Sequence, residues 1–224
     1  MRRRGLLFDL DGTLADTAPD LVAVLNQLLA RDGRPPAPFA IARNEVSNGA
    51  VGLLRLGFGL AADAPVDDSL RRDFLELYAS MGHTKSRLFI DFNDLLEVAS
   101  NAGAAWGVVT NKPAALTEAL LAVLGIRGQA GTVVSGDTLP VRKPNPAPLL
   151  HAAGELGIAP VDCIYLGDAE RDIVAGRAAG MRTVATSYGY IRPDEEVGRW
   201  GADACVDHPR KIGRMLQLMT GSGR

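Results

Sequence analysis

The stretch Gly5-Leu6-Leu7-Phe8-Asp9-Leu10-Asp11-Gly12-Thr13-Leu14 places two aspartates directly after a short apolar run. A continuous apolar run of about three to five residues is typical of a strand buried on both faces, as in a parallel sheet covered by helices. Five similar runs occur further along the chain: residues 106–109, 132–134, 164–166, 183–185 and 204–206. We therefore predict a buried parallel sheet whose first strand ends at the aspartates.

Longer helical stretches separate these runs. Three of them, residues 114–124, 146–156 and 173–179, are each followed or closed by a glycine, which is the residue that most often follows the last turn of a helix. Strands that alternate with helices predict a doubly wound α/β fold. In such folds ligands bind beyond the carboxyl ends of the strands.

Residues 16–87 break this alternation, and we call them the inserted segment. Helical runs at residues 20–30 and 70–80 flank a stretch from Pro35 to Pro65 that is punctuated by proline and glycine. The first strand thus lacks an immediate crossover helix, which predicts a helical insertion between this strand and its partner. An insertion at the catalytic end of a sheet can act as a lid.

The composition excludes several classes of protein. Hydrophobic residues make up 47% and charged residues 22% of the 224 residues, as in soluble globular proteins. A net charge of −2 and an aromatic content of 5% argue against a nucleic-acid surface. Asp9 interrupts the first apolar run too early for a signal peptide, and no run approaches the ~18 residues of a membrane span. Cys163 and Cys205 stand in apolar surroundings, so we expect two buried free thiols in a cytoplasmic protein without nucleic-acid or membrane partners.

Four aspartates follow two of the predicted strands. Asp9 and Asp11 stand at positions i and i+2, on one face of the chain, and Asp168 and Asp172 follow residues 164–166. Taken alone, each motif has a simpler interpretation. Asp9 and Asp11 could merely cap the end of a strand, and Asp172 could be a carboxylate that the dipole of a helix favours. Four converging carboxylates, however, would need a cation, and oxygen ligands point to Mg²⁺ rather than zinc. The histidines lie elsewhere and are expected at the surface or hydrogen-bonded: His83, His151 and His208.

Two further motifs have the chemistry to bind an anion. Thr110 and Asn111 follow a strand and lead into a helix, where a hydroxyl, an amide and free backbone N–H groups suit phosphate, although either residue could equally be an ordinary N-cap. Lys143 precedes two prolines that restrict its loop. A lone lysine in a loop is usually solvated, so Lys143 indicates an anion site only in combination with the other motifs.

In their order and placement the four motifs are similar to those of the haloacid dehalogenase (HAD) superfamily. The motifs are Asp9-Leu10-Asp11-Gly12-Thr13, Thr110, Lys143 and Gly167-Asp168 with Asp172. The resemblance spans nearly the whole chain. It implies a Rossmann-like parallel-sheet core formed by residues 1–15 and 88–224, with residues 16–87 as a small helical cap.

The resemblance also implies a role for each motif residue. Asp9 would be the nucleophile that forms an aspartyl-phosphate, and Asp11 would protonate the leaving alkoxide and later accept a proton from water. Dehalogenases expel halide and need no such acid, so Asp11 favours phosphate-ester hydrolysis. The implied ligands of Mg²⁺ are Asp9, Asp11 through its backbone carbonyl, Asp168 and Asp172. The implied phosphate-binding residues are Gly12, Thr110, Asn111 and Lys143.

Several stretches resemble particular branches of the superfamily. Residues 136–140 and 142–144 are similar to phosphoglycolate phosphatases, whereas residues 106–113, 188–193 and 200–203 are similar to phosphatases of N-acetylmuramic acid 6-phosphate in cell-wall recycling. A phosphomutase and a non-catalytic phosphate-binding protein are the alternatives. The expected partner is a small phosphorylated metabolite, and the expected assembly is a monomer or homodimer.

Residues of the inserted segment are candidates for substrate contacts. They are Arg43, Asn44, Glu45, Ser47 and Asn48. The chain returns from the insertion through residues 87–92, where the tyrosine or proline and glycine of many relatives are missing. The position of the second hinge is therefore open by several residues.

Overall fold

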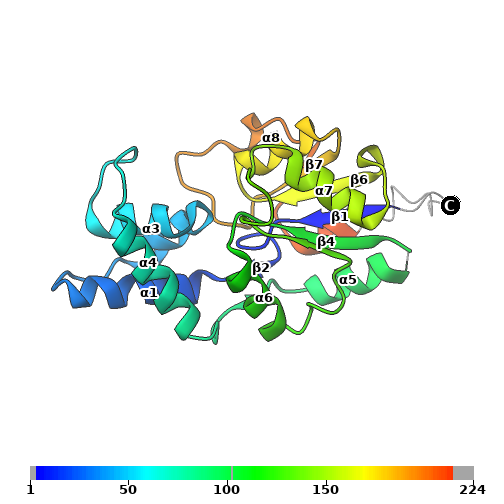
Figure 1. The fold of residues 1–224 in the computed structure, drawn as a ribbon. Coiled ribbons are helices and arrows are strands. Elements are labelled where there is room, and N and C mark those ends of the chain that lie inside the picture. Colours follow the sequence, from blue (N-terminus) through cyan, green and yellow to red (C-terminus); the bar gives the residue numbers. More distant parts are fainter. Residues whose placement is uncertain (1–3, 102, 214–224) are drawn as a thin grey trace.

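The computed structural model describes residues 4–101 and 103–213, and in this part of the chain six strands form one parallel sheet in the order β5-β4-β1-β6-β7-β8 (Figure 1). The strands are β1 (Gly5–Phe8), β4 (Ala105–Val109), β5 (Thr132–Val134), β6 (Cys163–Gly167), β7 (Arg182–Thr186) and β8 (Ala204–Val206). Every pairing among them is parallel. Each strand contains one of the predicted runs, so the predicted sheet is confirmed.

Helices cover both faces of this sheet (Figure 1). They are α5 (Phe92–Asn101) and α6 (Ala114–Val123) on one face, and α7 (Ala147–Leu156) and α8 (Glu170–Ala178) on the other. Alternate residues of β1 enter the two cores: Leu6 and Phe8 join the core under α5 and α6, and Leu7 joins the core under α7 and α8. Helices α6, α7 and most of α8 were predicted from the sequence, but α5 was not.

The order of the strands creates a switch point at β1. The chain runs from β1 through β4 to β5 on one side, then crosses to β6 and continues through β7 to β8. The carboxyl ends of β1, β4 and β6 therefore lie side by side at one edge of the sheet, where α/β folds bind their ligands. The backbone N–H of Asp9 donates to Leu166 O at 2.8 Å, which extends the pairing of β1 and β6 as far as the first aspartate.

The inserted segment folds into helices that lie beside the sheet (Figure 1). They are α1 (Ala18–Arg31), α2 (Phe39–Ala42), the 3₁₀ turn η1 (Arg43–Asn48), α3 (Gly49–Phe58) and α4 (Asp68–Ser80). The predicted helices at residues 20–30 and 70–80 are confirmed as α1 and α4. Helix α3 was not predicted, because it contains three glycines. Leu53 and Leu54 are fully buried against the neighbouring helices, and such packing stabilises a helix of poor intrinsic propensity.

The chain leaves and re-enters the sheet region through two short paired strands. β2 (Ala15–Asp16) and β3 (Arg87–Leu88) run antiparallel, with Ala15 opposite Leu88 and Asp16 opposite Arg87. A strand of two residues leaves no readable hydrophobic pattern, so neither was predicted. The two connections to the inserted segment therefore lie next to each other.

The two cysteines differ in exposure. Cys163 is buried, as predicted, whereas Cys205 is exposed and the prediction for it was wrong. Cys205 belongs to β8, the edge strand of the sheet, and an edge strand is not covered along its outer side. Among the helices of the described residues, none combines the length and the apolar character needed to cross a membrane.

Candidate active site

Three buried carboxylates meet at the switch point of the sheet. Asp9 follows β1, and Asp168 and Asp172 follow β6; each offers an oxygen that lies within 4.8 Å of the others. Burial raises the pKa of Asp9. Burial, together with the carboxylates of Asp9 and Asp172, raises the pKa of Asp168 to about 7. The cluster therefore carries more negative charge than its surroundings stabilise.

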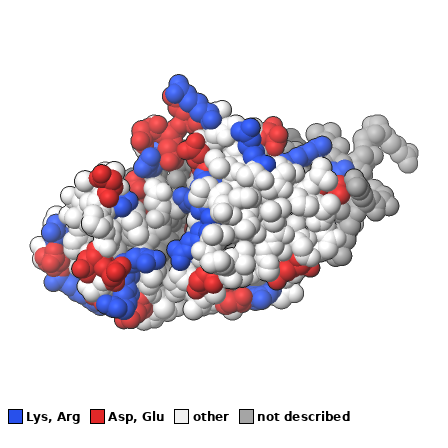
Figure 2. Space-filling view, turned by 45° about the horizontal axis from the view of Figure 1, so that its top comes forward, with Lys and Arg blue, Asp and Glu red and all other residues white. Residues whose placement is uncertain are grey.

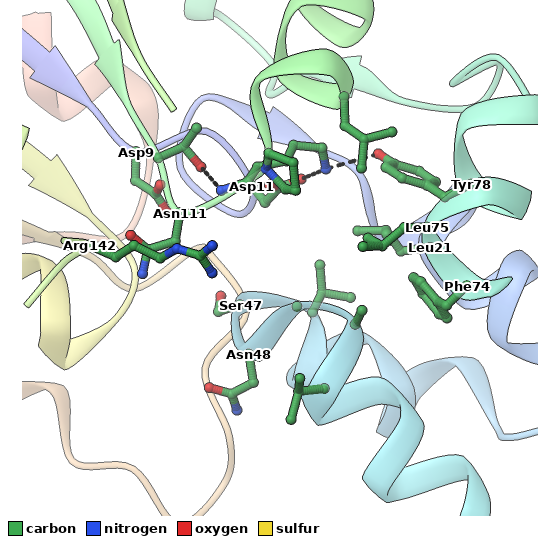
Figure 3. A pocket seen from close by; sticks show the side chains of 18 of the residues that line it. Asp9, Asp11, Leu21, Ser47, Asn48, Phe74, Leu75, Tyr78, Asn111 and Arg142 are labelled. Atoms are coloured by element: carbon green, nitrogen blue, oxygen red, sulfur yellow. Dashed lines mark hydrogen bonds and ion pairs between the residues drawn. The ribbon is translucent and has the colours of Figure 1, made fainter. Parts of the chain in front are cut away.

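One buried ammonium lies within this cluster. Lys143 Nζ is 2.8 Å from Asp9 Oδ1 (Figure 3). It is also 2.8 Å from Asp172 Oδ1, and it donates to Tyr165 Oη at 2.7 Å. Burial disfavours the charged amine, but the carboxylates of Asp172 and Asp9 outweigh it and raise the pKa of Lys143. Lys143 thus stays protonated. The partly buried Arg171 guanidinium also interacts electrostatically with these carboxylates, so two cationic side chains face three carboxylates.

The same cluster fits a divalent cation. Its donor set consists of carboxylate oxygens, which are the ligands that Mg²⁺ prefers, and none of the candidate ligands is a histidine or a cysteine. The raised pKa of Asp168 shows that a further positive charge would stabilise the ionised form. Asp9, Asp168 and Asp172 are the residues that would hold the ion through their side chains.

Asn111 supports Lys143 from the end of β4. The Asn111 side-chain amide donates to Lys143 O at 3.0 Å, and Asn111 Oδ1 accepts from the Lys143 N–H at 3.1 Å. This two-point contact fixes the main chain from which the ammonium extends. Asn111 also lines the cavity described below, and a direct contact of its backbone or side chain with phosphate stays a prediction.

The turn after Asp9 needs a glycine at its centre. Gly12 has a φ of 88°, in the left-handed region that glycine adopts without strain. A Cβ atom at this position would overlap the Asp168 carboxylate. Gly12 therefore lets the Asp9 turn lie directly against the loop that carries Asp168. The other predicted phosphate ligand, Thr110, is buried at the end of β4 beside this turn.

Asp11 lies outside the carboxylate cluster and has its own partners. Its Oδ1 accepts from Thr17 Oγ1 at 2.6 Å and from Lys112 Nζ at 2.9 Å. Lys112 Nζ is also 3.1 Å from Tyr78 Oη and 4.5 Å from the centre of the Tyr78 ring (Figure 3). Burial disfavours the Lys112 ammonium, but Asp11 and Tyr78 raise its pKa above the usual value.

The sequence alone assigned no role to Lys112 or to Tyr78. The only sequence signal for Lys112 is its place between a buried strand and a helix, where a lysine needs a partner. Nothing in the sequence identifies Tyr78 as that partner. It lies in α4 of the inserted segment, 34 positions before Lys112.

The inserted segment also reaches the carboxylate cluster. Ser47 Oγ donates to Asp168 Oδ2 at 2.6 Å, and Arg171 donates to Ser47 O. Arg43 lies over the Tyr190 ring, 4.8 Å from its centre, rather than at the cavity. Of the five candidates in this segment, Ser47 and Asn48 line the cavity described in the next paragraph, while Asn44 and Glu45 do not.

A cavity of about 290 Å³ separates the inserted segment from the sheet edge. Figure 2 shows a hollow at this border with lysine and arginine side chains along it. The wall on the side of the sheet is polar and contains Asp9, Asp11, Thr110, Asn111, Arg142 and Lys143. The opposite wall contains apolar side chains, among them Leu21, Val46, Val51, Phe74 and Leu75, and also the polar side chains of Ser47, Asn48, Arg71 and Tyr78 (Figure 3). A ligand would therefore meet charges at the sheet edge, and both hydrocarbon and polar groups on the opposite wall.

His83 was expected at the surface or hydrogen-bonded, and this expectation was wrong. It is 1% exposed, and among the described residues neither of its ring nitrogens has a hydrogen-bond partner. Its ring contacts the Tyr78 ring edge-on, with centres 4.5 Å apart. Burial and the nearby Lys112 ammonium lower the pKa of His83, so the imidazole is neutral at physiological pH.

Comparison with known proteins places these residues in a family context. A family model described as haloacid dehalogenase-like hydrolase matches residues 6–186. An N-acetylmuramic acid 6-phosphate phosphatase of Pseudomonas aeruginosa is 42% identical over 95% of this chain and 94% of its own. A phosphoglycolate phosphatase of Xanthomonas campestris pv. campestris is also 42% identical, over 93% of this chain and 94% of its own. A solved structure described as a predicted phosphoglycolate phosphatase from Haemophilus somnus has a TM-score of 0.84 and 28% identity, and covers 97% of this chain and 99% of that one.

Proposed function

Because the chain belongs to the haloacid dehalogenase-like hydrolase family, we propose that it hydrolyses a small phosphomonoester through an aspartyl-phosphate formed on Asp9. Curated relatives that span nearly the whole chain are phosphatases, and this chain is a phosphoric monoester hydrolase. One observation carries the assignment of the nucleophile. Asp9 is the carboxylate that both belongs to the buried acidic cluster and lines the cavity, with Asp11 two residues away on the same wall.

Two proton transfers by Asp11 balance the reaction. In the first half, an Asp9 oxygen attacks phosphorus, the bond from phosphorus to the ester oxygen breaks, and that oxygen takes a proton from Asp11. In the second half, water attacks phosphorus and gives a proton to Asp11, which frees Asp9 and inorganic phosphate. Thr110, Lys143 and the backbone around Gly12 are proposed to hold the phosphoryl oxygens while their charge shifts.

We propose Mg²⁺ as the cofactor, held by Asp9, the Asp11 backbone carbonyl, Asp168 and Asp172. Two unit negative charges ~4 Å apart repel by roughly 4 kcal/mol in a medium of effective dielectric about 20. A bound Mg²⁺ supplies the positive charge that offsets this repulsion between the nucleophile and the phosphate. Three carboxylates outnumber the two cationic side chains beside them, Lys143 and Arg171, which supports this assignment.

Two substrates are supported by different observations. Phosphoglycolate is a small anion, and Arg142 on the polar wall could meet its carboxylate. N-acetylmuramic acid 6-phosphate is larger and carries methyl groups, so the apolar side chains of Phe74 and Leu75 favour it.

A panel of phosphate esters is the direct test. We expect phosphate release from phosphoglycolate, from N-acetylmuramic acid 6-phosphate or from both, in the presence of Mg²⁺, and a fall to background with EDTA. Equal rates with Mg²⁺ and with EDTA would contradict the metal assignment. Conversion of a sugar 1-phosphate to an isomer without phosphate release would instead indicate a phosphomutase.

The pKa of Asp168 predicts how Mg²⁺ stabilises the fold. Its folded pKa of about 7 lies above the unfolded value of about 3.9. Without a cation, its contribution to stability is therefore present at low pH and is lost as the pH rises through about 7. Mg²⁺ binds the ionised form and competes with protons below that pH. We expect Mg²⁺ to raise the melting temperature more at about pH 8 than at about pH 6, measured by thermal unfolding with Mg²⁺ or EDTA.

Asp168→Asn provides the control for this measurement. The variant lacks the carboxylate whose ionisation the ion stabilises, so its Mg²⁺-induced shift should be small at both pH values. A shift as large and as pH-dependent as in the wild type would show that another group is responsible.

We also propose a division of the chain into a catalytic core and a cap. Residues 16–87 are proposed to form a cap that covers the site, and residues 1–15 with 88–224 to form the catalytic core. The inserted helices supply most of one hydrophobic cluster, to which only Leu116 and Tyr190 of its buried members come from outside residues 16–87, and this supports the division. We further propose that the protein acts in the cytoplasm, as a monomer or homodimer.

A further inference from the structure

We propose that Lys112 is a positioning residue for Asp11, and that it couples this acid–base carboxylate to the position of the inserted segment through Tyr78. The inference rests on the proposed function, because it assigns Asp11 the transfer of protons. Lys112 itself touches neither phosphorus nor the leaving group in this scheme. It acts through the carboxylate that does.

The main chain of Lys112 is fixed on both sides. Its N–H donates to Thr110 Oγ1 at 3.2 Å, and its carbonyl accepts from the Gly136 N–H at 2.8 Å. The side chain is 7% exposed. The ammonium therefore starts from a rigid point at the end of β4 and reaches Asp11 with little freedom to be elsewhere.

The contacts to Asp11 leave one carboxylate oxygen available. Among the described residues, Thr17 and Lys112 both donate to Oδ1, and Oδ2 receives no hydrogen bond. Asp11 also lines the cavity. Two donors that hold Oδ1 fix the plane of the carboxyl group, so Oδ2 is the atom placed to exchange a proton with the ester oxygen or with water. When that proton leaves, negative charge develops 2.9 Å from the ammonium, which stabilises it.

Tyr78 ties this arrangement to the inserted segment. It lies in α4, it is 1% exposed, and it belongs to the hydrophobic cluster of the inserted helices. Lys112 Nζ meets the Tyr78 hydroxyl at 3.1 Å while it also meets Asp11. A hydrogen bond weakens steeply beyond about 3.5 Å, so both contacts coexist only while α4 lies against the sheet edge. Asp11 is then held in place when the inserted segment covers the cavity.

Substrates with different leaving groups can show whether Lys112 positions the acid Asp11 or only forms a structural ion pair with it. An alkoxide is a poor leaving group and needs the proton from Asp11, whereas p-nitrophenolate leaves without one. A fault in the positioning of Asp11 should slow the first half-reaction of an alkyl ester and spare that of the aryl ester. A general disturbance of the site would slow both. The second half-reaction, which both esters share, follows departure of the leaving group and does not enter kcat/KM.

The test compares kcat/KM of Lys112→Met and Tyr78→Phe for p-nitrophenyl phosphate and for the alkyl ester that the wild type turns over best. For Lys112→Met we expect a loss of about 100-fold with the alkyl ester, carried by kcat rather than KM, and a change within about threefold with the aryl ester. Tyr78→Phe keeps the ring and removes the hydroxyl, so we expect about a tenfold loss with the alkyl ester alone. Lys211→Met, at an exposed lysine paired with Asp207, is the matched control and should match the wild type.

Equal losses for the two esters, or no loss with the alkyl ester, would overturn the role of Lys112. Tyr78→Phe decides the question if Lys112→Met does not fold, because it deletes a single hydroxyl. A wild type that releases phosphate from neither ester would instead overturn the proposed function. The two failures are therefore distinguishable.

Discussion

Asp9→Asn is expected to reduce phosphate release by at least about 10⁴-fold, because the amide cannot form the aspartyl-phosphate on which the proposed reaction depends. The substitution preserves the size of the side chain. It also removes one of three buried carboxylates whose mutual repulsion and burial raise the pKa of Asp9 and Asp168. The variant should therefore fold, and its melting temperature in EDTA should equal or exceed that of the wild type.

Steady-state phosphate release and thermal unfolding check both parts of this expectation. Asp207→Asn is the matched control, since Asp207 is an exposed aspartate paired with Lys211. Turnover by Asp9→Asn at a rate near that of the wild type would exclude Asp9 as the nucleophile. An inactive variant with a strongly lowered melting temperature would indicate a structural role instead.

The strands of the sheet follow from local features of the sequence, whereas their order in the sheet was not predicted. Each strand has an apolar run followed by a polar residue, and the motifs at these ends are close enough in kind and order to identify the family. The match of a family model to residues 6–186 confirms that identification. Convergence of Asp9 with Asp168 also follows, because parallel strands bring their carboxyl ends to one edge.

Contacts between distant elements could not be predicted in the same way. The periodicity of α4 indicates that Tyr78 is buried, but it does not say which element covers it. The meeting of Tyr78 with Lys112 depends on how the inserted helices pack against the sheet edge. The sequence could not single out Ser47 among the five candidates, because its contact with Asp168 also depends on how the inserted segment packs against the sheet edge. Helix α3 was missed because burial outweighs the low helix propensity of its glycines.

Lys143→Met is expected to be the most damaging substitution after that of the proposed nucleophile, since it should affect both stability and catalysis. Lys143 is the ammonium between Asp9 and Asp172, with a side chain that is 1% exposed. Its raised pKa means that its stabilising contribution is present throughout the neutral range and is lost only as the pH rises above the usual lysine range. Removal of one partner of a buried ion pair costs about 3–5 kcal/mol, which corresponds to a melting temperature lower by roughly 10 °C in a chain of this size.

The pH dependence of that loss identifies its cause. In Lys143→Met the unpaired carboxylates can regain protons at low pH, so the variant should lose less stability at about pH 5 than at about pH 8. Mg²⁺ should restore part of the melting temperature at the higher pH, because it neutralises the same oxygens, while activity stays at least about 10³-fold below the wild type. Lys211→Met should show none of these effects. If Lys143→Met in EDTA melted at the wild-type temperature at both pH values, the ammonium would not be what balances the carboxylates, and the electrostatic account of the site would be wrong.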